Sequence, residues 1–135
     1  MTAPTFMDLA LKAAENAGKA GEVPIGCVIV RNNEVIAEAG NRTLTDRDPT
    51  AHAEILAIRQ ATAAVGSERL TDCDLYVTLE PCTMCAGAIS FARIRRLYYG
   101  AADTSMLWLS EPTVRASLRS DTSSALTCTF SWFSV

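Results

Sequence analysis

Two short stretches decide the fold and the chemistry of this chain: Thr50-Ala51-His52-Ala53-Glu54 and Glu80-Pro81-Cys82-Thr83-Met84-Cys85. His52, Cys82 and Cys85 are ligand types that zinc prefers, and a catalytic zinc takes three protein ligands whereas a structural zinc takes four. Because His52 is the only histidine in the sequence, a second imidazole cannot complete a four-ligand site. The pattern therefore predicts a zinc ion with one position open for water, and Glu54 beside it.

The spacing of the two cysteines fits the start of a helix. We expect Pro81 to be the first helical residue, because proline has no N–H to leave unpaired there. Cys82 and Cys85 then share one helix face, and the positive end of the helix dipole favours their thiolate forms. We expect Thr50 to cap the other helix. Both helix N-termini then point at a single metal ion.

Each motif alone has a plainer interpretation. A Cys-x-x-Cys pair can be a redox pair or half of a zinc ribbon, and a lone histidine can be an ordinary core residue. Here Glu54 follows His52 by two residues and Pro81 precedes Cys82, which together match the signature of zinc deaminases. Under this interpretation Glu54 moves protons and is not a metal ligand.

The composition limits the number of domains and the cellular setting. With 135 residues, 49% of them hydrophobic, we expect a single domain over residues 1–135. The motif signature makes the expected domain a zinc-dependent deaminase. A net charge of -3 gives no overall basic surface, so a nucleic-acid contact requires a local patch or a dimer. We expect no membrane span. The absence of a signal sequence, together with Cys27, Cys73 and Cys128 as buried thiols, favours a reducing, cytoplasmic setting.

The first hundred residues predict alternating helices and strands. We expect a helix after Thr5 that ends near Gly18 or Gly21, strands over 25–30 and 35–39 joined at Asn32-Asn33, a helix ending at Gly66, and strands over 75–79 and 97–99. The last two strands flank the cysteine helix, which predicts a βαβ unit with parallel strands. The polar loop over 40–48 is either substrate-facing or an ordinary solvated loop.

The last third of the chain differs from the rest. Arg93, Arg95 and Arg96 form a basic cluster that is either a solvated helix end or, with tyrosines nearby, a contact for phosphates. From Thr104 onward the sequence becomes rich in serine and threonine. Partial alternation of apolar and polar residues over 125–135 suggests a late strand.

Longer strings around these motifs resemble the cytidine-deaminase-like superfamily and, within it, the bacterial tRNA-specific adenosine deaminases. The resembling strings are Glu22-Val23-Pro24-Ile25-Gly26, Gly40-Asn41-Arg42 and the segments 48–54, 78–88 and 93–101. The resemblance stops at Asp103. Residues 104–135 form an atypical tail, without the lysine- and glycine-containing loop and the basic closing helix of that family.

The resemblance implies a fold and an assembly. The expected fold is cytidine-deaminase-like α/β, with three α/β/α layers and a mixed five-stranded sheet. Members of the family act as homodimers whose tRNA surface draws on both subunits. By resemblance, His52, Cys82 and Cys85 bind one zinc ion per chain.

The resemblance also implies a reaction, the hydrolytic deamination of adenosine to inosine at the wobble position of a tRNA anticodon stem-loop. Zinc-activated hydroxide attacks C6 of adenine, and Glu54 carries the proton to the ring nitrogen and then to the leaving amine. Asn41 would hydrogen-bond the base. Asp103 would lie near the sugar of the flipped nucleotide.

Two other functions remain open from the residues alone. The same zinc core serves deaminases of a free base or nucleoside, such as guanine, cytosine or cytidine, which need a lid over the substrate. A non-catalytic zinc-containing RNA-binding module would have a closed metal site. Glu54 argues against this second alternative, because a closed site has no use for a proton carrier.

Overall fold

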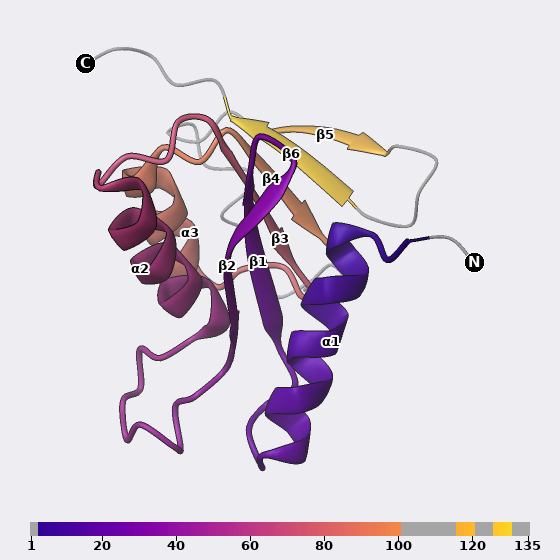
Figure 1. Ribbon diagram of the computed structural model, residues 1–135, viewed down its shortest axis with the longest axis vertical. Helices are drawn as coiled ribbons and strands as arrows, with labels where there is room; N and C mark the ends of the chain where they lie inside the picture. The colour runs from indigo at the N-terminus through magenta and orange to yellow at the C-terminus, as the bar shows by residue number, and fades with distance from the viewer. Residues whose placement is uncertain (1–2, 101–115, 121–125, 131–135) are drawn as a thin grey trace.

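The computed structural model describes residues 3–100 and, as backbone, two further strands at 116–120 and 126–130. One sheet forms the central layer, with helix α1 on one face and helices α2 and α3 on the other (Figure 1). The elements are α1 (Phe6–Lys19), β1 (Gly26–Arg31), β2 (Glu34–Gly40), α2 (Ala53–Val65), β3 (Cys73–Val77), α3 (Thr83–Ala92), β4 (Arg96–Tyr99), β5 (Ala116–Ser120) and β6 (Leu126–Phe130). The expected α/β fold with a mixed sheet is thus confirmed.

The order of strands in the sheet is β2-β1-β3-β4-β6-β5. Strand β1 pairs antiparallel with both β2 and β3, whereas β3 and β4 are parallel and are joined through α3. The predicted βαβ unit is therefore confirmed. The count of five strands is not confirmed, because the sheet continues beyond β4 with the antiparallel pair β6 and β5, which gives six strands among the described residues.

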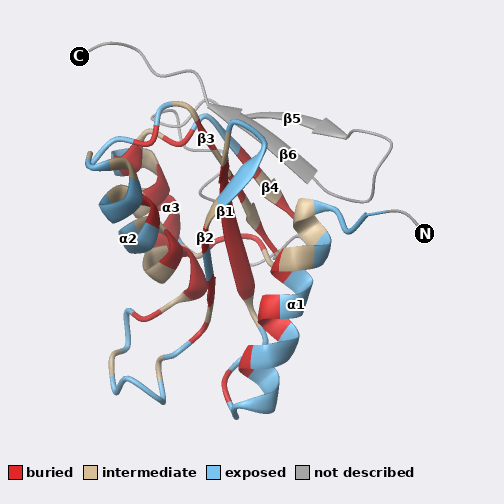
Figure 2. Ribbon diagram, in the orientation of Figure 1, coloured by how far each residue is buried: buried red, intermediate tan, exposed pale blue. Residues whose placement is uncertain are grey.

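Alternate residues of the strands point to opposite faces of the sheet. Cys27 and Ile29 on β1 and Leu75 on β3 pack toward α2 and α3, whereas Val28 packs toward α1. All four side chains are fully buried, and Figure 2 shows this buried central layer between the helices. Each large aliphatic side chain buried in this way contributes about 1.5–3 kcal/mol. Cys27 and Cys73 are buried as expected, and the side chain of Cys128 lies outside the described residues.

Helix α1 lies unusually close to the sheet. Its buried face consists of alanines, and a Cβ atom at Gly26 would overlap the backbone of Ala10 and Ala14. A Cβ atom at Gly40 would lie 2.8 Å from the Cβ atom of Ala17. Glycine at these two strand positions therefore allows the helix to approach the strands directly, which brings the end of α1 next to the end of β2.

Helices α2 and α3 begin later than the sequence predicts. His52 is the N-cap of α2 and Cys82 is the N-cap of α3, so the expectations of Thr50 as a cap and Pro81 as the first helical residue are wrong. The hydroxyl and the N–H of Thr50 both donate to Oδ1 of Asp48, at 2.7 and 2.9 Å. This local hydrogen bonding competes with capping. Cys82 keeps an extended backbone, so the helix starts after it.

The predicted turns agree with the structure. Asn32 and Asn33 join β1 to β2 with φ angles of 50° and 64°, as a tight hairpin turn requires. Gly66 ends α2 in the left-handed conformation, with φ 76°. Helix α1 ends at Lys19, between the two glycines expected to stop it. None of the helices in the described part of the chain combines the length and the hydropathy needed to cross a bilayer.

Candidate metal centre

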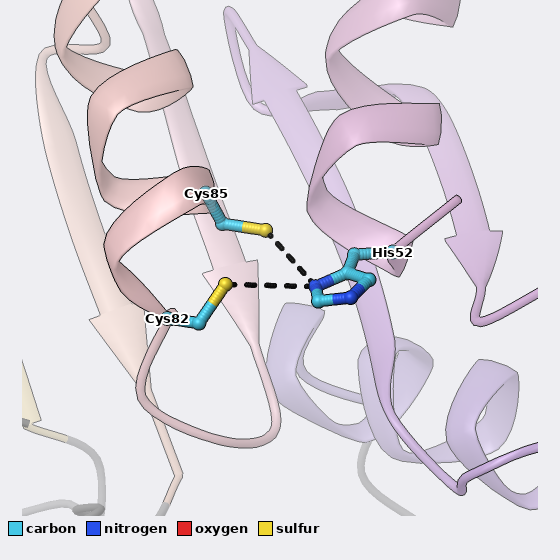
Figure 3. A group of neighbouring side chains, drawn as sticks. All are labelled: His52, Cys82 and Cys85. Carbon is cyan, nitrogen blue, oxygen red and sulfur yellow. Dashed lines mark hydrogen bonds between the residues drawn. The ribbon is translucent and has the colours of Figure 1, made fainter. Parts of the chain in front are cut away.

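Three side chains from the two helix N-termini converge on one point (Figure 3). His52 precedes the first turn of α2, Cys82 precedes that of α3, and Cys85 lies within the first turn of α3. The Nδ1 atom of His52 is 3.6 Å from Sγ of Cys82 and 3.5 Å from Sγ of Cys85. All three candidate ligand atoms lie within 4.8 Å of one another. The predicted convergence of the two helix N-termini is therefore observed.

These separations fit a tetrahedral zinc ion. Zn–N and Zn–S bonds of roughly 2.05 and 2.3 Å at a tetrahedral angle place nitrogen and sulfur about 3.6 Å apart. The ligand chemistry fits as well, because two thiolates and a neutral imidazole balance a divalent charge. The three side chains can therefore hold a zinc ion without rearrangement.

The two cysteines differ in their surroundings. Cys85 is completely buried, whereas Cys82 is half-buried. Burial raises the pKa of the Cys85 thiol, and the nearby carboxylate of Glu54 raises it further. A thiolate in this position therefore requires a nearby cation, which is what a metal bound to the triad supplies.

The way the helices begin explains why the ligands face each other. Within the described part of the chain, neither His52 nor Cys82 makes a side-chain hydrogen bond to the first turn of its own helix. Both side chains are therefore available to a ligand placed between the helices. The N–H groups of the two first turns put partial positive charge at the same place, which favours the thiolates.

Glu54 lies in the first turn of α2 and is 4% exposed. Among the described residues, its Oε1 atom has no hydrogen-bond partner. A buried polar atom left unpaired costs about 1–3 kcal/mol, so such atoms are rare and call for an explanation. The charge of Glu54 also contributes to the raised pKa of the Cys27 thiol, after burial itself. An unpaired carboxylate oxygen beside the metal triad fits a group that meets a substrate or a water molecule.

Asn41 links the end of β2 to the start of α2. Its side chain is 6% exposed, and its Oδ1 atom accepts the N–H of Ala53 at 3.0 Å. Its backbone N–H donates to the carbonyl of Ile25 at 3.1 Å. The side chain of Asn41 thus caps the first turn of α2, the role that the sequence predicted for Thr50. It is held next to His52 and Glu54, and Asp103 lies outside the described residues.

One member of the basic cluster is engaged in the fold. The guanidinium of Arg95 donates to both carboxylate oxygens of Asp74, at 3.0 and 2.9 Å. This pairing raises the pKa of Arg95. Arg95 therefore joins β4 to β3, and the sequence did not distinguish this role from a phosphate contact.

Sequence reasoning also missed a buried glutamate. Glu22 follows α1 and is 6% exposed, and its carboxylate contacts the loop between β2 and α2. Beside it, a cavity of 430 Å³ lies between α1, β2 and this loop, with Asn41 in its lining. The only signal in the sequence was the string Glu22-Val23-Pro24, which does not reveal a contact with a loop twenty residues further along.

The fold and the triad together define a zinc-binding domain of the deaminase type. Residues 1–101 match the family model described as the cytidine and deoxycytidylate deaminase zinc-binding region, and the chain belongs to that family. The family description names zinc binding, and the triad of this chain is a group of side chains that could hold the ion.

Comparison with individual relatives indicates which members of this family the chain resembles. The chain is 66% identical over 98 residues to a tRNA-specific adenosine deaminase of Agrobacterium fabrum, a match that covers 73% of this chain and 64% of the relative. It is 45% identical over 98 residues to a tRNA-specific adenosine deaminase of Aquifex aeolicus, covering 73% and 65%. The chain thus spans a little under two thirds of the length of these curated relatives. The resemblance predicted from the sequence is confirmed.

Solved structures agree with the sequence comparison. A structure from studies of A-to-I editing by tRNA:A34 deaminases at the wobble position of transfer RNA aligns with a TM-score of 0.76 and 59% identity, covering 80% of this chain and 83% of that one. The guanine deaminase of Bacillus subtilis aligns with a TM-score of 0.72 and 45% identity, covering 77% and 67%. The fold is therefore shared by tRNA and free-base deaminases.

Proposed function

We propose that this protein catalyses the hydrolytic deamination of adenosine to inosine at the wobble position of tRNA. The observation that carries the proposal is the buried Oε1 atom of Glu54, which has no hydrogen-bond partner in the described part of the chain and lies beside the triad of His52, Cys82 and Cys85. A site that only held a metal would have no use for this carboxylate. The 66% identity to the Agrobacterium tRNA deaminase and the 59% identity to the tRNA:A34 deaminase structure, against 45% to the guanine deaminase, support tRNA as the substrate.

Each chain would hold one zinc ion on the triad, through Nδ1 of His52 and the sulfurs of Cys82 and Cys85. When bound, zinc supplies a Lewis acid that lowers the pKa of water toward neutrality. The burial of Cys85 and Glu54 limits the access of bulk solvent to this side of the site. Electrostatic interactions are stronger in such a low-dielectric site.

Glu54 would move the protons of the reaction. Its Oε1 atom accepts one proton from the attacking water and delivers it to N1 of adenine, while the water oxygen bonds to C6. The carboxylate then takes the second proton from this oxygen and passes it to the amine, so that the C6–N bond breaks as the C6 carbonyl forms. Water adds at C6, ammonia leaves, and adenosine becomes inosine. General acid–base catalysis of this kind contributes about 10²–10⁴-fold to a rate.

Asn41 would orient the base. Because its Oδ1 atom already accepts the N–H of Ala53, its amide NH₂ group is the part left to donate to a substrate. Asp103 would lie near the sugar of the flipped nucleotide. These two residues would fix the adenosine relative to the proton carrier.

The proposal is tested by an ammonia assay on the zinc-loaded protein. One reaction contains an anticodon stem-loop with adenosine at the wobble position, and parallel reactions contain guanine, cytosine or cytidine. We expect ammonia and inosine from the stem-loop only, and neither from Glu54→Gln protein. Ammonia from guanine with an unreacted stem-loop would show a free-base deaminase instead. No ammonia from any substrate would favour a non-catalytic zinc module.

We also propose that residues 1–135 form one deaminase domain that acts as a homodimer in the cytoplasm, where tRNA is modified. Helix α3 carries two exposed apolar side chains, Met84 in its first turn at 38% and Phe91 near its C-terminal end at 83% exposure. A second copy covering this helix would bury them and bring its own surface to the substrate. Sedimentation tests the assembly: wild-type protein should be a dimer and Phe91→Glu a monomer, with Leu11→Glu, an exposed leucine on α1, as the control.

A further inference from the structure

The backbone of Glu22 is fixed by the end of α1. The N–H of Gly21 donates to the carbonyl of Gly18 at 3.1 Å, and the N–H of Glu22 donates to the carbonyl of Ala17 at 3.0 Å. Gly21 has a φ of 85°. This is the Schellman arrangement, which closes a helix and determines where the following residue lies. Glu22 is therefore attached to a rigid element.

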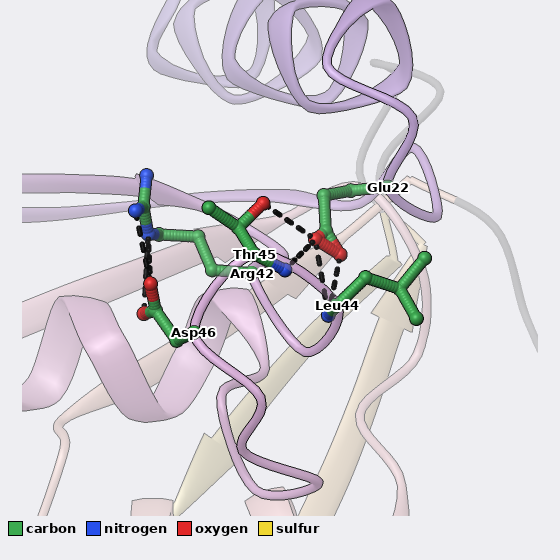
Figure 4. A network of polar contacts seen from close by, with 5 residues as sticks. All are labelled: Glu22, Arg42, Leu44, Thr45 and Asp46. Carbon is green, nitrogen blue, oxygen red and sulfur yellow. Dashed lines mark hydrogen bonds and ion pairs between the residues drawn. The ribbon is translucent and has the colours of Figure 1, made fainter.

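The side chain of Glu22 reaches across to the loop over 41–52, which we call the β2–α2 loop (Figure 4). Its Oε1 atom accepts the N–H of Leu44 at 2.9 Å. Its Oε2 atom accepts the N–H and the hydroxyl of Thr45, both at 3.2 Å, and a second contact from the N–H of Leu44 at 3.2 Å. One carboxylate thus satisfies two consecutive backbone N–H groups at the middle of the loop.

The carboxylate is suited to this task because it is charged. Burial raises the pKa of the Glu22 carboxyl, but the hydrogen bonds from Leu44 and Thr45 outweigh burial and the pKa is lowered overall. Glu22 is therefore ionised at neutral pH. Hydrogen bonds to an ionised acceptor are stronger than those to a neutral one.

The β2–α2 loop transmits this attachment to the metal site. Its two ends are joined, because the N–H of Arg42 donates to the carbonyl of Ala51 at 3.0 Å. Across the loop, the N–H of Asp48 donates to the carbonyl of Thr43 at 3.1 Å, and Arg42 forms an ion pair with Asp46 at 2.9 Å. The loop is thus internally bonded and moves as a unit.

The ends of this unit carry the groups that the proposed reaction uses. Asn41 begins the loop and accepts the N–H of Ala53, and His52 ends it as the N-cap of α2. Glu54 follows in the first turn of the same helix. A change in how the middle of the loop is held therefore reaches the base-binding group and the proton carrier together.

We propose that Glu22 is a positioning residue for the deamination: it anchors the β2–α2 loop to the end of α1 and so holds Asn41 and the first turn of α2 in register with the substrate. The inference rests on the proposed function. Glu22 itself does not touch the metal ligands. Its effect on the reaction is transmitted through the backbone of the loop.

The matched control is Glu38. It lines the same 430 Å³ cavity as Glu22, but its side chain is exposed on β2. Glu38→Gln therefore removes the same charge from the same surface without loosening the loop. Thr45→Val loosens the anchor from the other side, because it removes the hydroxyl contact and keeps the backbone N–H.

The test compares Glu22→Gln, Glu38→Gln and Thr45→Val proteins for zinc content, steady-state kinetics on the stem-loop, and exchange of individual backbone amides. Small errors in position cost up to about 10²-fold in rate. We expect Glu22→Gln to keep its zinc, to lose about 10-fold or more in kcat, and to exchange the amides of Leu44, Thr45 and Ala53 faster. Thr45→Val should show a smaller loss, and the Glu22→Gln/Thr45→Val double variant should lose less than the two single losses combined. Glu38→Gln should stay within about twofold of wild type.

Several outcomes overturn the inference. Glu22→Gln and Glu38→Gln with equal kcat would mean that the anchor does not serve the reaction. Loss of zinc or of folding in Glu22→Gln, with full kcat in Thr45→Val, would mean a structural role only. If wild-type protein leaves the stem-loop unreacted, the proposed function fails. The anchoring role of Glu22 is then tested by the exchange rate of the Ala53 amide alone: an unchanged rate in Glu22→Gln overturns it.

Discussion

Helices α2 and α3 begin at the same metal site but are built differently. The start of α3 supplies two sulfurs, Cys82 and Cys85, and follows β3 after a short connection. The start of α2 supplies one nitrogen from His52, and also the buried carboxylate of Glu54. It follows a long loop whose middle is held by another part of the chain.

The difference separates two tasks. The β3–α3 side supplies two of the three candidate ligands, and a direct strand-to-helix connection places them. The β2–α2 side holds one ligand and the proposed proton carrier, and Asn41 and Glu22 support it from outside the helix. Mutations of the three candidate ligands should therefore lose metal and activity together, whereas mutation of Glu54 on the β2–α2 side should lose activity and keep the metal.

The largest effect should come from the ligands. His52→Ala and Cys85→Ala should each lose zinc and all measurable activity, because two remaining ligands cannot hold the ion in place. Metal analysis of purified protein and the ammonia assay measure both losses. Cys73→Ala, at a buried thiol outside the triad, is the control and should retain its zinc. Full zinc content in either ligand variant contradicts the assignment.

Glu54→Gln should lower the activity without lowering the zinc content. Activity should fall by about 10²–10⁴-fold, the usual contribution of a general acid–base, because the amide cannot accept the proton of water. Zinc content should stay equal to that of wild type, measured on the same preparation. A parallel loss of zinc would make Glu54 a ligand, and the distinction between the two helix starts would disappear.

Variants at Asn41 should distinguish the effect of its capping oxygen on stability from the effect of its amide nitrogen on activity. Asn41→Ala removes the acceptor for the N–H of Ala53, and should lower the free energy of unfolding by about 1 kcal/mol, as loss of a helix cap does. Asn41→Asp keeps an acceptor and should lie closer to wild type in urea unfolding. Both should deaminate the stem-loop more slowly, since neither offers the NH₂ group. Equal destabilisation by the two variants would argue against the capping role.

The smallest effects concern the bodies of the two helices and should have opposite signs. Gly66 ends α2 with φ 76°, so Gly66→Ala should destabilise by about 1 kcal/mol through backbone strain. Gly87 lies within α3, and among the described residues no atom lies within 4 Å of a Cβ built on it. Gly87→Ala should therefore stabilise by about 0.5–1 kcal/mol. Thermal or urea unfolding measures both changes.

The sequence predicted the convergence of the three candidate ligands and most of the elements, because those signals are local. The spacing of Cys82 and Cys85, the turn at Asn32-Asn33 and the stop at Gly66 each depend on a few neighbouring residues. The start of α2 was predicted wrongly because several side chains compete for the hydrogen bonds that determine which residue caps the helix. Asp48 takes the hydroxyl of Thr50, and a side chain twelve residues before Ala53 takes over the cap.

The contacts that support the site could not be predicted from short stretches of sequence, because they join residues that are far apart in the chain. Glu22 meets Leu44 and Thr45 only because Gly26 and Gly40 let α1 approach the strands, which no periodicity reveals. Arg95 likewise finds Asp74 only when β4 lies beside β3. The two residues of such a pair lie far apart in the sequence, so their contact depends on how the elements pack. It cannot be predicted before that packing is known.

The separation of the ligands along the chain has a consequence for biosynthesis. His52 lies 30 residues before Cys82 and 33 before Cys85, and the intervening β3 must join β1 before the two helix starts can face each other. A nascent polypeptide that has emerged only as far as α2 has one ligand and cannot capture the ion. Loading of the proposed ion would therefore wait until β3 has joined β1, and the ion would then link parts of the domain that were synthesised at different times.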